Sequence, residues 1–244
     1  MSEQRTGGQL IVDRLRANGV DRVFTVPGES FLPVLDALHD APDIQLVVCR
    51  QEGGATMMAE AHAKLTGRPG VCFVTRGPGS ANALAGLHVA SQDSTPLLVF
   101  VGQVPSGFQE REAWQEVDVG ALFGSVAKWA TDLQDTERLP EYLNRAFSTA
   151  LSGRHGPVVM GLPENLLYAS VTAPAPDLRR CMITGSSSSE ERTSAFRLRM
   201  ISVTSSTTPS RVANSCWLPS ILTLVTEAPG MEESRVRRRE LPSV

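Results

Sequence analysis

The sequence is poor in cysteine, lysine and aromatic residues and has no long hydrophobic run, and each shortage argues against a class of protein. The four cysteines are scattered and form no Cys-x-x-Cys pair, so we expect reduced thiols and no zinc site. The four histidines are dispersed as well, which predicts no metal site built from them. No segment reaches the roughly 20 consecutive apolar residues that span a bilayer.

The charge and the first residues of the chain narrow the possibilities further. A formal net charge of -3 and a pI near 5.9 argue against a nucleic acid or an anionic membrane as a partner bound by charge alone. The first ten residues, MSEQRTGGQL, contain no apolar segment of the kind found in signal peptides. We therefore expect a soluble, cytoplasmic protein.

From residue 6 to about residue 165, apolar segments alternate with amphipathic ones. Strands are predicted at six apolar segments, which are residues 23–26, 44–48, 71–75, 96–102, 126–133 and 157–163. Helices are predicted between them, at residues 7–19 with Thr6 as a cap, 31–40, after Glu52, 80–92 and 139–153. This pattern indicates a doubly wound α/β fold, with a mostly parallel six-stranded sheet and helices on both faces. Its ligand should bind at the carboxyl ends of the strands.

The chain divides by composition into a domain at residues 1–170 and an irregular tail at residues 171–244. The tail is dense in Ser, Thr and Arg and follows neither a helical nor a strand period. Such a composition is typical of disordered sequence and is also what an out-of-frame reading of GC-rich DNA produces. We interpret the tail as disordered or non-native sequence, and a basic tail that binds an anionic partner is the alternative.

Glu52 is an ionisable residue between an apolar strand and a helix that begins with small residues. It could be a first-turn acid that complements the helix dipole and stays near water. It could instead be a carboxylate in an apolar pocket, where its pKa rises and it shares a proton with a ligand nitrogen. Gly53, Gly54 and Ala55 favour the second interpretation, because small residues let a flat ligand approach the start of the helix.

Three further segments follow predicted strands, namely VPGES (26–30), TRGPGSAN (75–82) and AWQEVD (113–118). The glycine-rich segment could cradle a phosphate on backbone N–H groups. It is neither a Walker A loop nor a good dinucleotide fingerprint, because no Gly-Lys-Ser/Thr follows and Asn82 stands where a small residue belongs. Each segment alone can equally be a structural turn or loop. In a parallel sheet, however, all of them converge on one crevice.

Together these motifs resemble the N-terminal, pyrimidine-binding domain of thiamine-diphosphate enzymes, above all the acetolactate synthase large subunit and its benzoylformate-decarboxylase-like relatives. The resemblance covers about residues 6–170 and rests on VFTVPGES, RQEGGATMMAEAHAKLTG, TRGPGSAN, REAWQEVD and GPVVMGLPENLL, in this order. It implies thiamine diphosphate as cofactor and a 2-keto acid as substrate, in lyase or transferase chemistry of the kind used in branched-chain amino acid biosynthesis.

The resemblance also implies roles for individual residues. In that family the acid matching Glu52 hydrogen-bonds N1′ of the cofactor's aminopyrimidine, which helps the thiazolium ring lose its C2 proton. A glutamine matching Gln115 reaches into the active site. We therefore expect Glu52 and Gln115 to be catalytic and expect no metal ligand. The cofactor-binding positions implied are Val26, Pro27, Gly28, Glu52, Thr75, Pro78, Asn82 and Gln115.

The sequence departs from the family's pattern in several places. Gln51, Gly53 and Trp114 stand where many relatives have His, Gln and Phe, so the resemblance names no particular keto acid. The Gly-Asp-Gly…Asn signature that binds Mg²⁺ and the diphosphate does not occur. FAD, which some acetolactate synthases carry, depends on a middle domain that has no counterpart here. The resemblance thus implies half a site, which a homodimer or a separate diphosphate-binding subunit would complete.

Three interpretations of the function follow. The chain is a truncated half of an acetolactate synthase-like enzyme that is inactive alone, a subunit of a split enzyme, or a non-catalytic binding module that retains the fold. The first is our prediction. It predicts that the isolated chain binds thiamine diphosphate weakly or not at all and exposes an apolar face.

Overall fold

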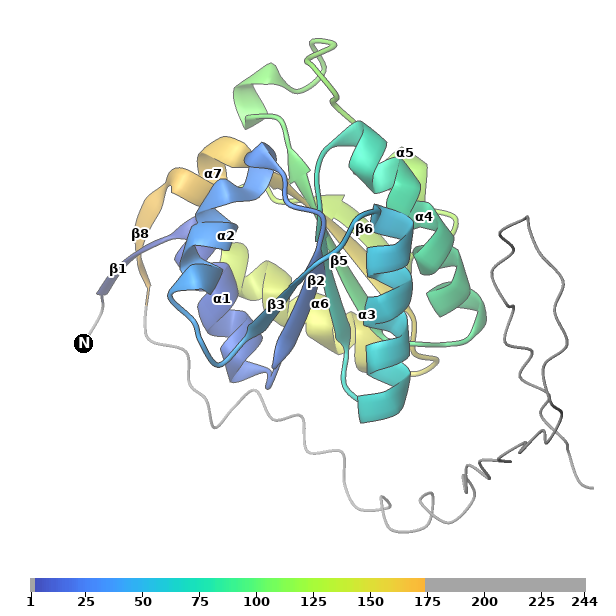
Figure 1. Cartoon of the computed structure of the whole chain (residues 1–244). Helices are drawn as coiled ribbons and strands as arrows, with labels where there is room; N and C mark the ends of the chain where they lie inside the picture. The colour runs from blue at the N-terminus through green and yellow to red at the C-terminus, as the bar shows by residue number, and fades with distance from the viewer. Residues whose placement is uncertain (1–2, 174–244) are drawn as a thin grey trace, which may run out of the picture. The chain divides into compact units, whose positions relative to one another are not determined.

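The computed structural model describes residues 3–173 and shows a three-layer α/β fold (Figure 1). Its main sheet has the strand order β3-β2-β4-β5-β7-β6, and all neighbouring strands are parallel. The predicted doubly wound, six-stranded architecture is therefore confirmed. The strands are β2 (Arg22–Thr25), β3 (Gln45–Val48), β4 (Gly70–Val74), β5 (Leu97–Gln103), β6 (Trp129–Asp132) and β7 (Pro157–Pro163).

Three helices cover each face of the sheet (Figure 1). One face is covered by α1 (Gly7–Ala17), α2 (Leu32–His39) and α6 (Leu139–Leu151). The other face is covered by α3 (Glu52–Thr66), α4 (Gly77–Gln92) and α5 (Val119–Phe123). Successive residues of a strand point to opposite faces, so Cys72 and Val74 pack under the second group of helices while Phe73 packs under the first. Because both of their faces are buried, the central strands are apolar along nearly their whole length.

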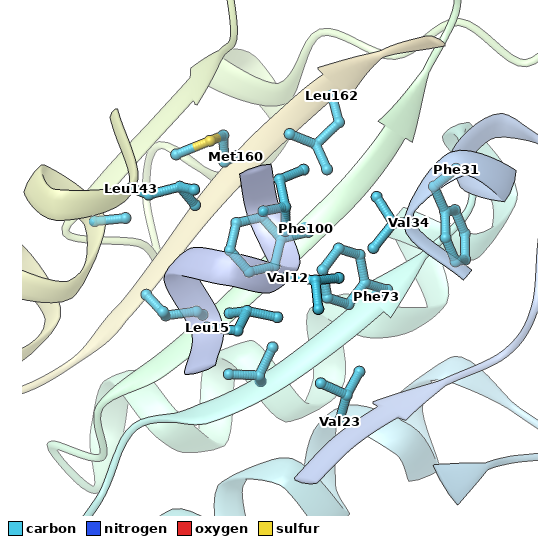
Figure 2. Close-up of a cluster of buried hydrophobic side chains, with 14 of the residues drawn as sticks. Val12, Leu15, Val23, Phe31, Val34, Phe73, Phe100, Leu143, Met160 and Leu162 are labelled. Carbon is cyan, nitrogen blue, oxygen red and sulfur yellow. The ribbon is translucent and has the colours of Figure 1, made fainter. Parts of the chain in front are cut away.

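Aromatic side chains fill the centre of the first face (Figure 2). Phe73 of β4 stacks on Phe100 of β5 with ring centroids 4.7 Å apart, and Phe31 lies 5.9 Å from Phe73. Val12 and Leu15 of α1 pack over these rings, as Figure 2 shows. This core fixes the strands whose carboxyl ends carry the predicted motifs.

Local sequence signals explain where the helices begin and end. Thr6 caps α1 as predicted, and it forms a capping box with Gln9. Gly67 ends α3 in the left-handed conformation, with φ of +69°. The helix α4 begins at Gly77, three residues earlier than predicted, because Pro78 is well suited to a first helical turn. The Gly-Pro-Gly segment is therefore part of the helix and not a turn before it.

Three elements had no counterpart among the predicted ones. A short helix, α7 (Glu164–Tyr168), follows β7, and β1 (Glu3–Thr6) pairs with β8 (Ser170–Ala173) in an antiparallel two-stranded sheet. The strand β8 crosses the predicted boundary at residue 170. The rest of the predicted tail, residues 174–244, lies outside the described residues, so its assignment stays a prediction. Within residues 3–173, no helix is both long and apolar enough to cross a membrane.

Candidate functional site

The order of the strands places a topological switch point between the carboxyl ends of β2 and β4, which is where open α/β sheets have their ligand crevice. The chain leaves β2 for β3 on one side and then returns to β4 on the other side of β2. Connections diverge at such a switch point, and ligands of open α/β sheets bind there. Three of the predicted segments follow β2, β3 and β4 directly, beginning at Val26, Glu52 and Thr75.

Glu52 is the first residue of α3 and is half-buried. Its Oε2 accepts a hydrogen bond of 2.9 Å from the side-chain amide of Asn82 on α4. Among residues 3–173, no hydrogen bond is made to its Oε1. Gln51 caps the helix by accepting from the backbone N–H of Gly54 at 2.8 Å. The carboxylate is thus held in place through one oxygen, while the other remains able to accept a proton or a hydrogen bond.

Close packing of α3 and α4 brings this carboxylate and amide together. A Cβ atom on Gly86 would lie 2.3 Å from Thr56 Oγ1, and one on Gly53 would lie 3.1 Å from the Asn82 carbonyl oxygen. Thr56 lies in this contact, and its hydroxyl is within hydrogen-bonding distance of carbonyl oxygens on both helices, including that of Ala83 at 3.2 Å. The glycines therefore matter because they allow the two helices to approach.

Thr75 links the end of β4 to the turn after β2. Its Oγ1 lies 2.9 Å from the hydroxyl oxygen of Ser30, and a Cβ atom on Gly28 would lie 2.7 Å from its Cβ. Gly28 is thus needed for the turn to lie against Thr75. Val26 in the same turn is half-buried and Pro27 is exposed.

Gly79 lies between Thr75 and Glu52. A Cβ atom on Gly79 would come within 2.8 Å of Thr75 Cγ2 and 3.3 Å of Glu52 Oε1. Only a glycine therefore fits between Thr75 and the Glu52 carboxylate at this position. Gly79, Thr75 and the side-chain amide of Asn82 are the immediate neighbours of the carboxylate.

The loop between β5 and α5 brings Gln115 to the start of α4. The backbone N–H of Gly77 donates to the carbonyl oxygen of Gln115 at 2.8 Å, and Gln115 has a positive φ of 62°. Its side chain is half-buried and makes no hydrogen bond within residues 3–173. Pro78, beside it in the first turn of α4, is exposed, and Trp114 is 76% exposed. The structure thus places all eight predicted cofactor-binding residues at one end of the sheet, where the strands have their carboxyl ends.

Arg76 was not among the predicted site residues. It is buried between Thr75 and Gly77, donates to Glu164 of α7 at 2.9 Å and lies 3.5 Å from the Glu29 carboxylate. Its Nε is buried without a hydrogen-bond partner among the described residues. The sequence shows only that an arginine lies within a glycine-rich segment. The carboxylates that pair with it are distant in the sequence, with Glu29 47 residues upstream and Glu164 88 residues downstream.

The surroundings of the two described thiols, Cys49 and Cys72, make them unreactive. Burial raises the pKa of Cys72 well above its usual value, and the nearby Cys49 and Glu52 raise it further. Burial also raises the pKa of Cys49. Both thiols therefore stay protonated near neutral pH. Within residues 3–173, no group of three or more His, Cys, Asp or Glu side chains is arranged to hold a metal ion.

Comparison with known proteins places the chain in a family. Residues 5–122 match the family described as thiamine pyrophosphate enzyme, N-terminal TPP binding domain. The chain is 40% identical over 171 residues to the mitochondrial acetolactate synthase catalytic subunit of Saccharomyces cerevisiae, covering 70% of this chain and 25% of that protein. It is 43% identical over 164 residues to the acetolactate synthase isozyme 2 large subunit of Escherichia coli, covering 67% of this chain and 30% of that protein.

A third relative is the acetolactate synthase large subunit of Lactococcus lactis, 38% identical over 172 residues, with 70% of this chain and 30% of that protein covered. The chain thus spans between a quarter and a third of the length of these curated relatives. The matching region contains every element around the crevice, from Val26 to Gln115. Residues 5–122 are therefore an N-terminal thiamine pyrophosphate binding domain of the thiamine pyrophosphate enzyme family.

Proposed function

We propose that the crevice binds the aminopyrimidine ring of thiamine diphosphate (thiamine pyrophosphate) and that Glu52 accepts a hydrogen bond from, or shares a proton with, a nitrogen of that ring. The observation that carries the proposal is the state of the Glu52 carboxylate. Asn82 holds one oxygen, while Oε1 accepts no hydrogen bond within residues 3–173 and lies beside Gly79. A carboxylate held in this way can exchange a proton with a heteroaromatic nitrogen without losing its orientation.

The residues around Glu52 fit such a ring. A side chain at position 79 would collide with Thr75 and lie against Oε1, so the glycine keeps this carboxylate oxygen uncovered on that side. When bound, thiamine diphosphate supplies a nucleophilic thiazolium carbon that can attack a 2-keto acid and accept the electrons released by decarboxylation. The contribution of this chain is to bind and orient the pyrimidine ring and to hold a proton at Glu52.

The other site residues support this binding in different ways. The turn Val26–Gly28 forms one wall of the crevice and is fixed by its contact with Thr75. Pro78 and Asn82 present the first turns of α4 to the ring, and Gln115 lies at the rim. In the whole protein these residues would serve an acetolactate synthase-like reaction on 2-keto acids, with Glu52 and Gln115 as the catalytic side chains of this domain.

The crevice is half of a cofactor site in this proposal, because no metal-binding cluster exists within residues 3–173 to hold a diphosphate. A separate diphosphate-binding subunit would complete it, since a second copy of the same chain repeats the pyrimidine half and brings no Gly-Asp-Gly…Asn signature. Without the diphosphate contacts, we expect the dissociation constant of thiamine diphosphate from the chain alone to exceed roughly 100 μM, equivalent to a binding free energy weaker than about -5.5 kcal/mol.

Titration of the ¹⁵N-labelled full chain with thiamine diphosphate and Mg²⁺ tests the proposal. We expect amide signals to shift at the turn 26–28, at Glu52 and in the segment 75–82. Glu52→Gln should weaken binding by about 10-fold or more, because a hydrogen bond to a charged group contributes roughly 1.5–3 kcal/mol. Glu137→Gln, which changes an exposed carboxylate outside the crevice, should bind as the unaltered chain does.

Two results would contradict the proposal. One is an absence of any shift at these residues with about 10 mM thiamine diphosphate, which corresponds to a binding free energy weaker than about -2.7 kcal/mol. The other is an equal dissociation constant for the Glu52→Gln variant and the unaltered chain. A dissociation constant in the low micromolar range would show that the diphosphate is also bound, and would overturn the half-site interpretation.

A further inference from the structure

The loop between β5 and α5, residues 104–118, adopts a backbone that its sequence does not favour. Glu110, Glu112 and Gln115 have φ values of 62°, 53° and 62°, in a region that residues other than glycine rarely adopt. Interactions with the rest of the domain must therefore hold the loop in this form. The loop projects beyond the carboxyl ends of the strands (Figure 1), and it carries Gln115 to the start of α4.

Apolar packing and polar contacts meet at the base of this loop: Val104 is buried and Val117 packs against the core, while a polar cavity lies beside them. The space beneath it is a cavity of about 320 Å³, and every lining residue except Val117 is polar. Glu110, Glu116, Asp118 and Asp132 contribute four carboxyl groups to the lining. In this polar region, hydrogen bonds add to the apolar packing that keeps the two ends of the loop together.

Gln103 closes the base of the loop with a single side chain. It is the last residue of β5 and is 1% exposed. Its Oε1 accepts from the backbone N–H of Val104 at 3.0 Å, and its Nε2 donates to the carbonyl oxygen of Val117 at 2.5 Å. Val104 and Val117 lie at opposite ends of the loop. The primary amide is suited to this position because it is both a donor and an acceptor.

We propose that Gln103 is a positioning residue for Gln115, an inference that rests on the proposed function of the crevice. Val117, which Gln103 holds, is two residues from Gln115. The carbonyl oxygen of Gln115 in turn accepts from the first N–H of α4, at Gly77. Gln103 thus fixes the loop at its base, the Gly77 hydrogen bond fixes it at the crevice, and the strained backbone between them presents the Gln115 side chain to the bound ring.

Two variants of Gln103 separate its donor from its acceptor. Gln103→Met keeps the length of the side chain and removes both hydrogen bonds. Gln103→Glu keeps the acceptor for Val104 and loses the donor for Val117. The matched control is Thr136→Val, which removes a buried hydroxyl that donates to the Leu166 carbonyl oxygen at 2.9 Å, on a different connection of the fold.

The readouts are the ¹⁵N–¹H signals of Gly77, Trp114 and Gln115, the midpoint of urea unfolding, and the affinity for thiamine diphosphate. We expect both Gln103 variants to stay folded and to shift these three signals. They should also bind thiamine diphosphate at least about 5-fold more weakly, a loss of roughly 1 kcal/mol converted at 1.4 kcal/mol per tenfold. Thr136→Val should lower the unfolding midpoint to a similar extent and leave the three signals and the affinity unchanged.

The inference fails if Gln103→Met leaves the signals of Gly77 and Gln115 where they were, or if Thr136→Val alters affinity as much as Gln103→Met does. A failure of the proposed function looks different. In that case the unaltered chain would show no response to thiamine diphosphate, while the effect of Gln103 on the loop signals would still be measurable without any ligand.

Discussion

Asp132 has a half-buried carboxyl group to which the proposed function assigns no role. It ends β6 and leans over Gly161 of β7, where a Cβ atom would lie 1.8 Å from its Oδ1. That oxygen is buried and has no hydrogen-bond partner among the described residues. Burial raises the pKa of Asp132 to about 6; the Gln103 amide opposes this rise, whereas the Asp118 and Glu116 carboxylates add to it.

The raised pKa makes Asp132→Asn a pH-dependent stabilising substitution. An aspartate in an unfolded chain has a pKa of about 3.9, so the folded protein binds the Asp132 proton more tightly than the unfolded chain does. The free energy of unfolding therefore falls as the pH rises from about 4 to 6, because the folded protein keeps the Asp132 proton longer than the unfolded chain does. Above pH 6 the ionised Asp132 lowers the free energy of unfolding by up to roughly 3 kcal/mol. We expect Asp132→Asn to be more stable than the unaltered chain by about 1–3 kcal/mol near pH 7.5 and to lose most of this advantage near pH 4.5.

Urea unfolding at the two pH values measures this difference. Asp40→Asn, which changes an exposed aspartate at the end of α2, should shift stability little at either pH. A stability difference for Asp132→Asn that is the same at both pH values would contradict the prediction. No sequence pattern points to this residue, because the end of an edge strand normally faces water and the partial burial of Asp132 depends on Gly161 and the loop above it.

At the scale of elements, the contact between α3 and α4 determines the geometry of the crevice. The helices approach through Gly53 and Gly86, and this approach brings Asn82 within reach of Glu52. Both helices rely on alanine and glycine on their buried sides, so a single added methyl group cannot be absorbed by a flexible neighbour.

Gly86→Ala should separate the two helices. The new Cβ atom would lie 2.3 Å from Thr56 Oγ1 and 2.8 Å from the Met57 backbone nitrogen, so α4 must shift. We expect a loss of about 1–3 kcal/mol in the free energy of unfolding, measured in urea, and weaker binding of thiamine diphosphate. Gly54→Ala is the matched substitution, because its Cβ meets only Gln51 Oε1 at 3.9 Å. It should stabilise the chain by roughly 0.5–1 kcal/mol, and a loss of stability as large as that of Gly86→Ala would contradict this account.

The elements themselves were largely predictable from the sequence. Apolar segments such as residues 96–102 can only be strands buried on both faces, and β5 occupies Leu97–Gln103. Three features were not predictable. The start of α4 depends on whether Gly77–Gly79 joins the helix, α7 is only five residues long, and β1 and β8 are paired across more than 160 residues of sequence. Their stability comes from contacts that no local pattern records.

The same limit applies to the candidate site. Glu52 could be identified from its place between a strand and a helix, and the resemblance added Asn82 and Gln115. Neither the position of Glu52 nor the resemblance predicts the hydrogen bond between Glu52 and Asn82, because this bond depends on the approach of two helices. Arg76 and Gln103 were missed for a related reason. Each is a polar residue made important by partners far along the chain, at Glu164 and Val117.

At the scale of the whole molecule, the outer side of α3 is apolar. Met57 and Met58 are 45% and 42% exposed, and Leu65, seven residues after Met58 on the same side of the helix, is 85% exposed. Val48 of the edge strand β3 is 63% exposed. An apolar stripe of this kind on a surface helix usually marks a contact with another protein surface.

This stripe leads to the last prediction, that the chain self-associates through α3. Sedimentation should show a reversible, concentration-dependent dimer, because burying Met58 and Leu65 against a second copy removes apolar surface from water. The double variant Met58→Glu/Leu65→Glu should remain monomeric at about 10-fold higher concentration, since about 1.4 kcal/mol of lost contact changes the constant tenfold. The control Leu32→Glu/Tyr168→Glu changes two exposed apolar residues elsewhere, 49% and 56% exposed, and should dimerise as before. A strictly monomeric unaltered chain would contradict the prediction. Since Glu52 begins the same helix, a second chain bound to α3 would lie beside the crevice.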